Sequence, residues 1–120
     1  MPTHKMNKTI AGYHLLMILS AVDFRFNINE ENVIREYLLQ EFPFQVNLDQ
    51  QMEVISALQY DEWEPHFEKC IDDFYADSIQ KERMNLLQFA LHLTKADEVI
   101  TKEENYFLQK LFVAWDAERE

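Results

Sequence analysis

The sequence contains little glycine, proline or cysteine: one Gly, three Pro and one Cys among 120 residues. Turns that depend on glycine, and glycine-rich loops that cradle phosphate, are therefore nearly excluded. The single cysteine, Cys70, cannot form an internal disulfide, which is consistent with a reducing compartment.

Positive charge is also scarce, because 22 acidic residues face only 11 basic ones and the net charge is −11. Nucleic acids and anionic membranes both attract basic surfaces, so we expect neither as a partner. Cations or a basic protein surface fit this charge better, although an acidic surface also serves solubility alone.

Long apolar runs are missing too, since none reaches the roughly 18 residues of a membrane-spanning helix. The stretch "GYHLLMILSAV" at 12–22 is apolar but includes His14. We interpret it as a core helix of a cytoplasmic protein rather than as a signal peptide. The 48% hydrophobic content is enough for one sizeable core, so we expect residues 1–120 to form a single domain.

What is abundant is Leu, Glu, Gln and Lys, all good helix formers. Apolar residues recur at helical spacing over six segments, and no segment shows a convincing strand period. The sequence predicts an all-α fold, a compact helical globule of about six helices. The expected helices cover about residues 5–23, 28–41, 48–59, 63–77, 79–96 and 102–117.

Helix boundaries follow from capping residues. Asn27 and Thr101 each precede a glutamate by three positions, as in a capping box. Asn47 is expected to cap the third helix, and Pro43 to stop the second. Pro65 fits the first turn of the fourth helix. Expected core residues include Leu15, Leu16, Ile18, Leu19, Val33, Ile34, Leu38, Ile55, Phe67, Ile71, Phe74, Leu87, Phe107, Leu108 and Leu111.

Two parts of the chain resemble each other: residues 20–38 align without gaps with residues 94–112. Each part contains an Asp, then a helix cap, then a Glu at the same offsets. We infer two pseudo-symmetric helix–turn–helix halves that arose by internal duplication. The equivalent positions are Asp23 and Asp97, Asn27 and Thr101, and Glu30 and Glu104.

The segment "KADEVITKEENYFLQKL" at 95–111 resembles the TerB-like domain of the tellurite-resistance family. That resemblance extends to the length and helix order of nearly the whole chain, and it implies an all-helical fold with two similar halves. It also implies that a divalent metal binds at Asp23, Glu30, Asp97 and Glu104. Phe24 and Glu98 stand where the family has Gly.

The chemistry of these four residues allows two interpretations. Carboxylates without a Cys or His suit hard cations, so the metal would be Ca²⁺ or Mg²⁺. Alternatively, Glu104 behind Thr101 only completes a capping box and complements the positive helix end. The segment is not an EF-hand, because it lacks the D-x-D-x-D-G loop.

Other candidate residues have mainly structural interpretations. His66, Cys70, Asp73 and Asp77 share one helical face and form at most half of a zinc site, so we expect Cys70 to be a core residue. His14 and His92 are expected to be satisfied core or edge histidines. Tyr60, Trp63 and Trp115 fit either the core or a surface patch for a partner helix.

No motif of a known enzyme class is present, so we expect a protein without catalytic activity. The leading hypothesis is a cytoplasmic adaptor or sensor module tuned by a divalent cation. The resemblance associates it with tellurite or stress resistance. A metal-independent protein-interaction domain is the alternative, and a hydrolase with a carboxylate-held metal is the third. The sequence leaves the protein partner and self-association open.

Overall fold

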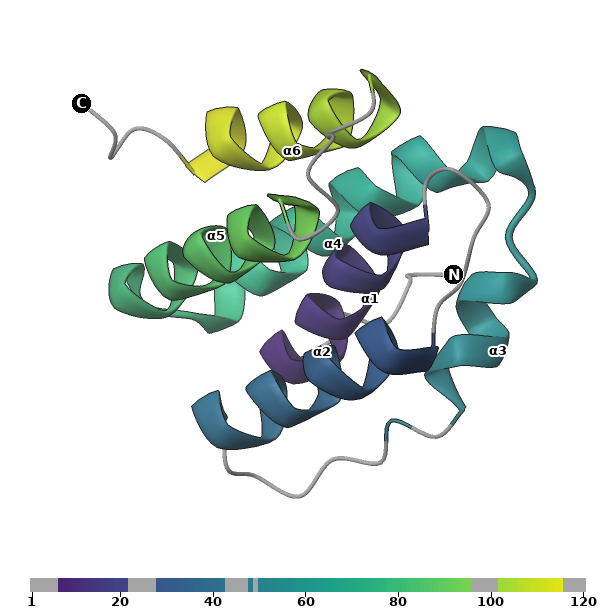
Figure 1. Ribbon diagram of the computed structural model, residues 1–120. Coiled ribbons are helices and arrows are strands. Elements are labelled where there is room, and N and C mark those ends of the chain that lie inside the picture. The colour runs from purple at the N-terminus through teal and green to yellow at the C-terminus, as the bar shows by residue number, and fades with distance from the viewer. Residues whose placement is uncertain (1–6, 22–27, 43–47, 49, 96–101, 116–120) are drawn as a thin grey trace.

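The computed structural model describes residues 7–21, 28–42, 48, 50–95 and 102–115. These ranges are mostly helical and contain no strand, so the predicted all-α fold is confirmed (Figure 1). The elements are α1 (Lys8–Ala21), α2 (Ile28–Glu41), α3 (Gln51–Ser56), a 3₁₀ turn η1 (Tyr60–Glu62), α4 (Trp63–Asp77), α5 (Gln80–Lys95) and α6 (Lys102–Trp115).

Helix α1 is the centre of the globule. It is apolar on all sides, and residues 11–19 are all buried. It packs against α2, α3, α4, α5 and α6. Gly12 permits this close approach, because a Cβ there would lie 3.2 Å from Leu38, and 3.3 Å from both Leu86 and Phe74.

The outer helices bury one side each, as their sequences predict. Phe67, Cys70, Ile71 and Phe74 form the buried side of α4. The expected buried side of α6 is confirmed as well. Its Trp115 stacks on Phe74 with ring centroids 5.1 Å apart, which links the two helices.

Two tryptophans considered as surface candidates belong to the core, because Trp63 and Trp115 are both buried. The side chain of Tyr60 lies outside the described residues. The expectation for Val33 was wrong, since 47% of it is exposed. Ile34 and Leu38 make the inward side of α2, and Val33 lies next to that side rather than on it.

Most helix bounds match the expectation, but the third helix is shorter. α3 begins at Gln51 and ends at Ser56, and the chain then forms the 3₁₀ turn η1 at Tyr60–Glu62. The backbone N–H of Gln59 donates to the Glu62 carboxylate at 2.7 Å, which favours this turn over a continued helix. Pro65 is the third residue of α4, as expected. The proposed caps Asn27, Asn47 and Thr101, and Pro43, lie outside the described residues.

The two predicted halves correspond to α1 with α2 and to α5 with α6. Each pair packs together (Figure 1). The turns between them, residues 22–27 and 96–101, lie outside the described part of the chain, so the duplication stays a prediction. Within the described ranges, every helix is too short or too polar to span a membrane.

Candidate functional site

The four acidic residues expected to bind a metal fall largely outside the described residues. Asp23 and Asp97 belong to the undescribed turns. Glu30 and Glu104 are each the third residue of their helix, α2 and α6, but their side chains are not described. The proposed Ca²⁺ or Mg²⁺ site therefore stays a prediction.

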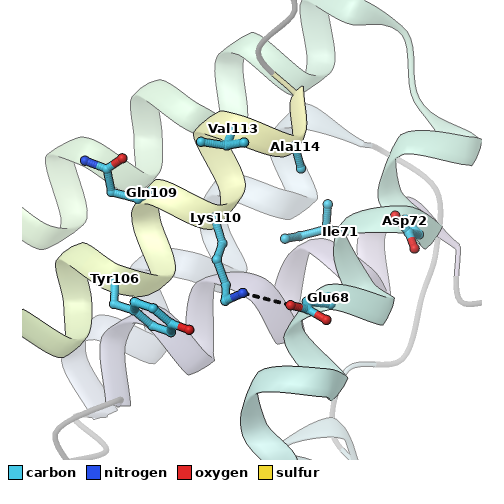
Figure 2. A pocket seen from close by; sticks show the side chains of 8 residues that line it. All are labelled: Glu68, Ile71, Asp72, Tyr106, Gln109, Lys110, Val113 and Ala114. Atoms are coloured by element: carbon cyan, nitrogen blue, oxygen red, sulfur yellow. Dashed lines mark hydrogen bonds and ion pairs between the residues drawn. The ribbon is translucent and has the colours of Figure 1, made fainter.

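A groove of about 510 Å³ runs between α4 and α6, and we call it the α4–α6 groove (Figure 2). Ile71 forms part of its base and is almost completely buried. Val113 and Tyr106 stand on its α6 side with 69% and 52% of their surface exposed. The lining residues are Glu68, Ile71, Asp72, Tyr106, Gln109, Lys110, Val113 and Ala114.

The groove is bridged by an ion pair network. The Lys110 Nζ of α6 lies 2.8 Å from carboxylate oxygens of both Glu64 and Glu68 of α4 (Figure 2 shows the pair with Glu68). The Tyr106 hydroxyl also donates to Glu64, at 2.7 Å. Hydrogen bonds from Lys110 and Tyr106 lower the pKa of Glu64, and those carboxylates raise the pKa of Lys110. These contacts connect the two walls of the groove.

Two further hollows adjoin the groove. One, of about 520 Å³, shares Tyr106 with it, and the other, of about 230 Å³, shares Ile71. Along this whole line, acidic side chains outnumber the basic Lys102 and Lys110. The acidic ones are Asp61, Glu64, Glu68, Asp72 and Glu103.

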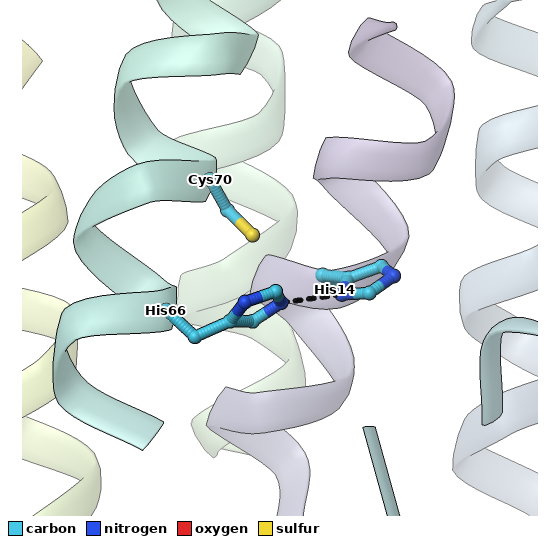
Figure 3. A group of neighbouring side chains, drawn as sticks. All are labelled: His14, His66 and Cys70. Atoms are coloured by element: carbon cyan, nitrogen blue, oxygen red, sulfur yellow. Dashed lines mark hydrogen bonds between the residues drawn. The ribbon is translucent and has the colours of Figure 1, made fainter. Parts of the chain in front are cut away.

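A second group of polar side chains lies between α1 and α4, and we call it the His–His–Cys cluster. It consists of His14 of α1 and of His66 and Cys70 of α4, which project toward one another (Figure 3). One potential ligand atom from each residue lies within 4.8 Å of the others. His14 and Cys70 are buried, and His66 is partly exposed.

Hydrogen bonds orient the two imidazoles of this cluster. His14 Nδ1 lies 2.8 Å from His66 Nε2, and His14 Nε2 lies 2.7 Å from Gln51 Oε1. An amide oxygen only accepts, so His14 Nε2 carries the proton and donates to Gln51. His14 Nδ1 therefore accepts, and His66 Nε2–H donates to it.

Burial sets the protonation of the His–His–Cys cluster. Desolvation lowers the pKa of His14, and together with the neighbouring His14 it lowers the pKa of His66 to about 4. Desolvation also raises the pKa of Cys70 to about 12. At neutral pH both imidazoles are uncharged and the thiol keeps its proton. The lone pair of His14 Nδ1, the protonated Nε2 of His66 and the Cys70 sulfur therefore lie close together.

Of the four residues on one face of α4, the structure brings together only His66 and Cys70 in this cluster. Asp73 forms an ion pair with Lys69, and the Asp77 carboxylate accepts from the backbone N–H of Lys8 at 3.0 Å. His14, which was expected to be a satisfied core or edge histidine, supplies the contact from a second helix. The sequence feature that could have indicated this contact is His14 itself, a single histidine in an otherwise apolar helix.

Comparison of the chain with protein-family models, curated proteins and solved structures found no match. The resemblance to the TerB-like family therefore rests on the residues named above.

Proposed function

We propose that this protein is a non-enzymatic adaptor whose α4–α6 groove binds a basic amphipathic helix of a partner protein. The observation that carries the proposal is the groove itself, in which exposed Val113 and Tyr106 provide apolar surface beside acidic side chains. Helices of partner proteins bind in such grooves through an apolar stripe.

Charge identifies the kind of helix that fits. The groove and its adjoining hollows carry an excess of carboxylates, and the whole chain has a net charge of −11. Lys110 is already paired with Glu64 and Glu68, so it adds little attraction for an acidic partner. Lys or Arg residues beside the apolar stripe of the partner would meet Asp72 and Glu103 and increase the rate of encounter.

The resemblance to the TerB-like family adds a metal and a biological setting to this proposal. A divalent cation at Asp23, Glu30, Asp97 and Glu104 would tune the adaptor, and the biological setting would be tellurite or stress resistance. A cytoplasmic location is part of the proposal, because Cys70 is a free thiol and suits a reducing compartment.

The alternative is a metal-independent interaction domain, which would use the same groove without any cation. The two differ in one measurable property, the dependence of partner affinity on Ca²⁺ or Mg²⁺. The third hypothesis, a hydrolase with a carboxylate-held metal, requires an open metal position beside a general base.

The groove is tested by site-specific cross-linking in cells of the source organism. A photoreactive benzophenone residue replaces Val113 in one variant and Leu39 in a control. Leu39 is 49% exposed on α2 and is no part of the groove. We expect position 113 to label a partner segment with helical apolar spacing and Lys or Arg beside it, and position 39 not to label that segment.

Charge reversal provides the second arm of this test. Asp72→Lys should abolish the cross-link from position 113, whereas Gln40→Lys on the exposed side of α2 should preserve it. Equal labelling from positions 113 and 39, or an acidic partner segment, would contradict the proposal. Cross-linking to a second copy of this chain, or to residues 116–120, would also overturn it.

A further inference from the structure

The geometry points to a zinc site at the His–His–Cys cluster, with His14, His66 and Cys70 as its three protein ligands. These three residues are different from the residues that line the α4–α6 groove and from the four acidic residues of the predicted Ca²⁺ or Mg²⁺ site. The zinc site joins α1, the central helix, to α4, which carries one wall of the groove.

The residue types match the preferences of zinc. Imidazole nitrogen and thiolate sulfur are its usual ligands, with the ion about 2.0–2.1 Å from nitrogen and about 2.3 Å from sulfur. The ligand atoms of the three residues already lie within 4.8 Å of one another. His66 and Cys70 are four positions apart on α4, so they share a face, and His14 approaches from α1.

The position of the ion follows from the hydrogen bond between the histidines. His14 Nδ1 and His66 Nε2 are 2.8 Å apart and share a proton. Two nitrogens bound to one tetrahedral zinc lie about 3.3 Å apart, so the rings separate by about 0.5 Å when zinc replaces that proton. His66 then carries its proton on Nδ1 instead and remains neutral.

The charge balance of binding involves one proton. The Cys70 thiol loses its proton to solvent as its sulfur bonds to zinc, while both imidazoles bind as neutral ligands. The site thus changes from neutral to a net charge of +1. The strongly negative chain favours this gain of positive charge.

Gln51 already accepts the hydrogen bond that would orient His14 as a zinc ligand. Histidines that bind metals donate their other ring N–H to an oxygen, which fixes the ring orientation. His14 does so through Nε2, 2.7 Å from Gln51 Oε1. Its Nδ1 is thereby held as the free lone pair that faces His66.

Access and the fourth coordination position come from the open side of the cluster. His66 is partly exposed, whereas His14 and Cys70 are buried. An ion can enter past His66, and a water molecule can take the fourth tetrahedral position there.

Binding is tested on the tag-free, full-length chain under reducing conditions by calorimetric titration with Zn²⁺. We expect one zinc per chain and the release of one proton, measured in buffers of different ionisation enthalpy. Cys70→Ala and His66→Gln should each weaken binding at least tenfold. Gln51→Ala should weaken it by about 10- to 100-fold, as loss of an outer-shell partner does.

Controls separate this site from adventitious binding. His92→Gln removes an exposed histidine outside the cluster and should leave the affinity unchanged. Co²⁺ added to the parent protein should produce a thiolate-to-metal charge-transfer band, and this readout needs no variant to fold. A parent chain that binds no zinc, variants with parental affinity, or a cobalt complex without the thiolate band would each overturn the proposal.

Discussion

His14 of α1 and His66 of α4 are hydrogen-bonded through Nδ1 and Nε2 at 2.8 Å, across the contact between two helices that are far apart in the sequence. The pair is anchored on one side by Gln51 and adjoins Cys70 on the other. A buried polar arrangement of this kind is stable only while its members keep their partners and their charge state. Its response to protons and to metal ions therefore provides direct tests.

The metal-free protein should lose stability as the pH falls from about 6.5 to about 4. Burial holds the pKa of His66 at about 4, and that of His14 also lies below the usual value. The unfolded chain then binds more protons than the folded one in this window, so acid favours unfolding. The share of His66 is on the order of 2 kcal/mol, after allowance for its partial exposure.

Urea denaturation at several pH values, with a chelator present, measures this effect. His66→Gln keeps a donor toward His14 but cannot titrate, so its stability should vary less with pH than that of the parent. The nearby charges on Glu62, Lys69 and Asp73 are retained in this variant. His92→Gln serves as the control and should follow the parent. Identical pH profiles for the parent and His66→Gln would refute the account of the pair.

Gly12→Val should destabilise the fold by about 1–3 kcal/mol, because overpacking in a filled core costs that much. A Cβ at this position would already lie 3.2 Å from Leu38, and 3.3 Å from Leu86 and Phe74. Gly12→Ala should cost less, since the gain in helix propensity of about 1 kcal/mol offsets part of the crowding. Thermal unfolding of both variants gives the comparison. Greater stability in Gly12→Val would mean that α1 lies farther from its neighbours.

The predicted acidic metal site has its own test. Millimolar Ca²⁺ or Mg²⁺ should raise the melting temperature of the parent, because a ligand that binds only the folded state stabilises it. The increase should be smaller for Asp97→Asn and for Glu104→Gln, which retains a capping side chain but lacks the charge. An unchanged melting curve of the parent in these cations would end this hypothesis and leave the zinc site unaffected.

Partner binding at the groove should weaken as salt increases. The attraction between the acidic border and a basic helix is screened over about 10 Å at 0.1 M salt, and over shorter distances at higher concentrations. Titrations of the cross-linked partner segment, as a synthetic peptide, should show rising dissociation constants in increasing NaCl. Asp72→Asn should reduce this salt dependence. Affinity that is independent of salt would mean that the apolar contacts alone bind the partner.

Most of the fold could be predicted from the sequence because local signals agree with one another. The bounds of α2 and α4 match the expected ranges 28–41 and 63–77, and the apolar spacing of α4 identifies its buried side. α3 was predicted too long, because the sequence did not reveal that Glu62 would accept the Gln59 N–H and favour a 3₁₀ turn.

The His–His–Cys cluster and the α4–α6 groove could be predicted from the sequence only in part. Helical spacing placed His66 and Cys70 on one face, and it placed Cys70 correctly in the core. The contact of His14 with His66 depends on how α1 packs on α4, which helix periodicity does not determine. The α4–α6 groove likewise depends on the spacing between two helices, and Lys110 reaches across that spacing to Glu64 and Glu68.

X-ray absorption at the zinc edge of the zinc-loaded protein tests the proposed metal site most directly. We expect one sulfur at about 2.3 Å and a shell of nitrogen or oxygen at about 2.0–2.1 Å that includes imidazole scattering. The sulfur contribution should vanish in Cys70→Ala. A shell of oxygens alone in the parent protein would place the zinc on carboxylates and contradict binding by His14, His66 and Cys70.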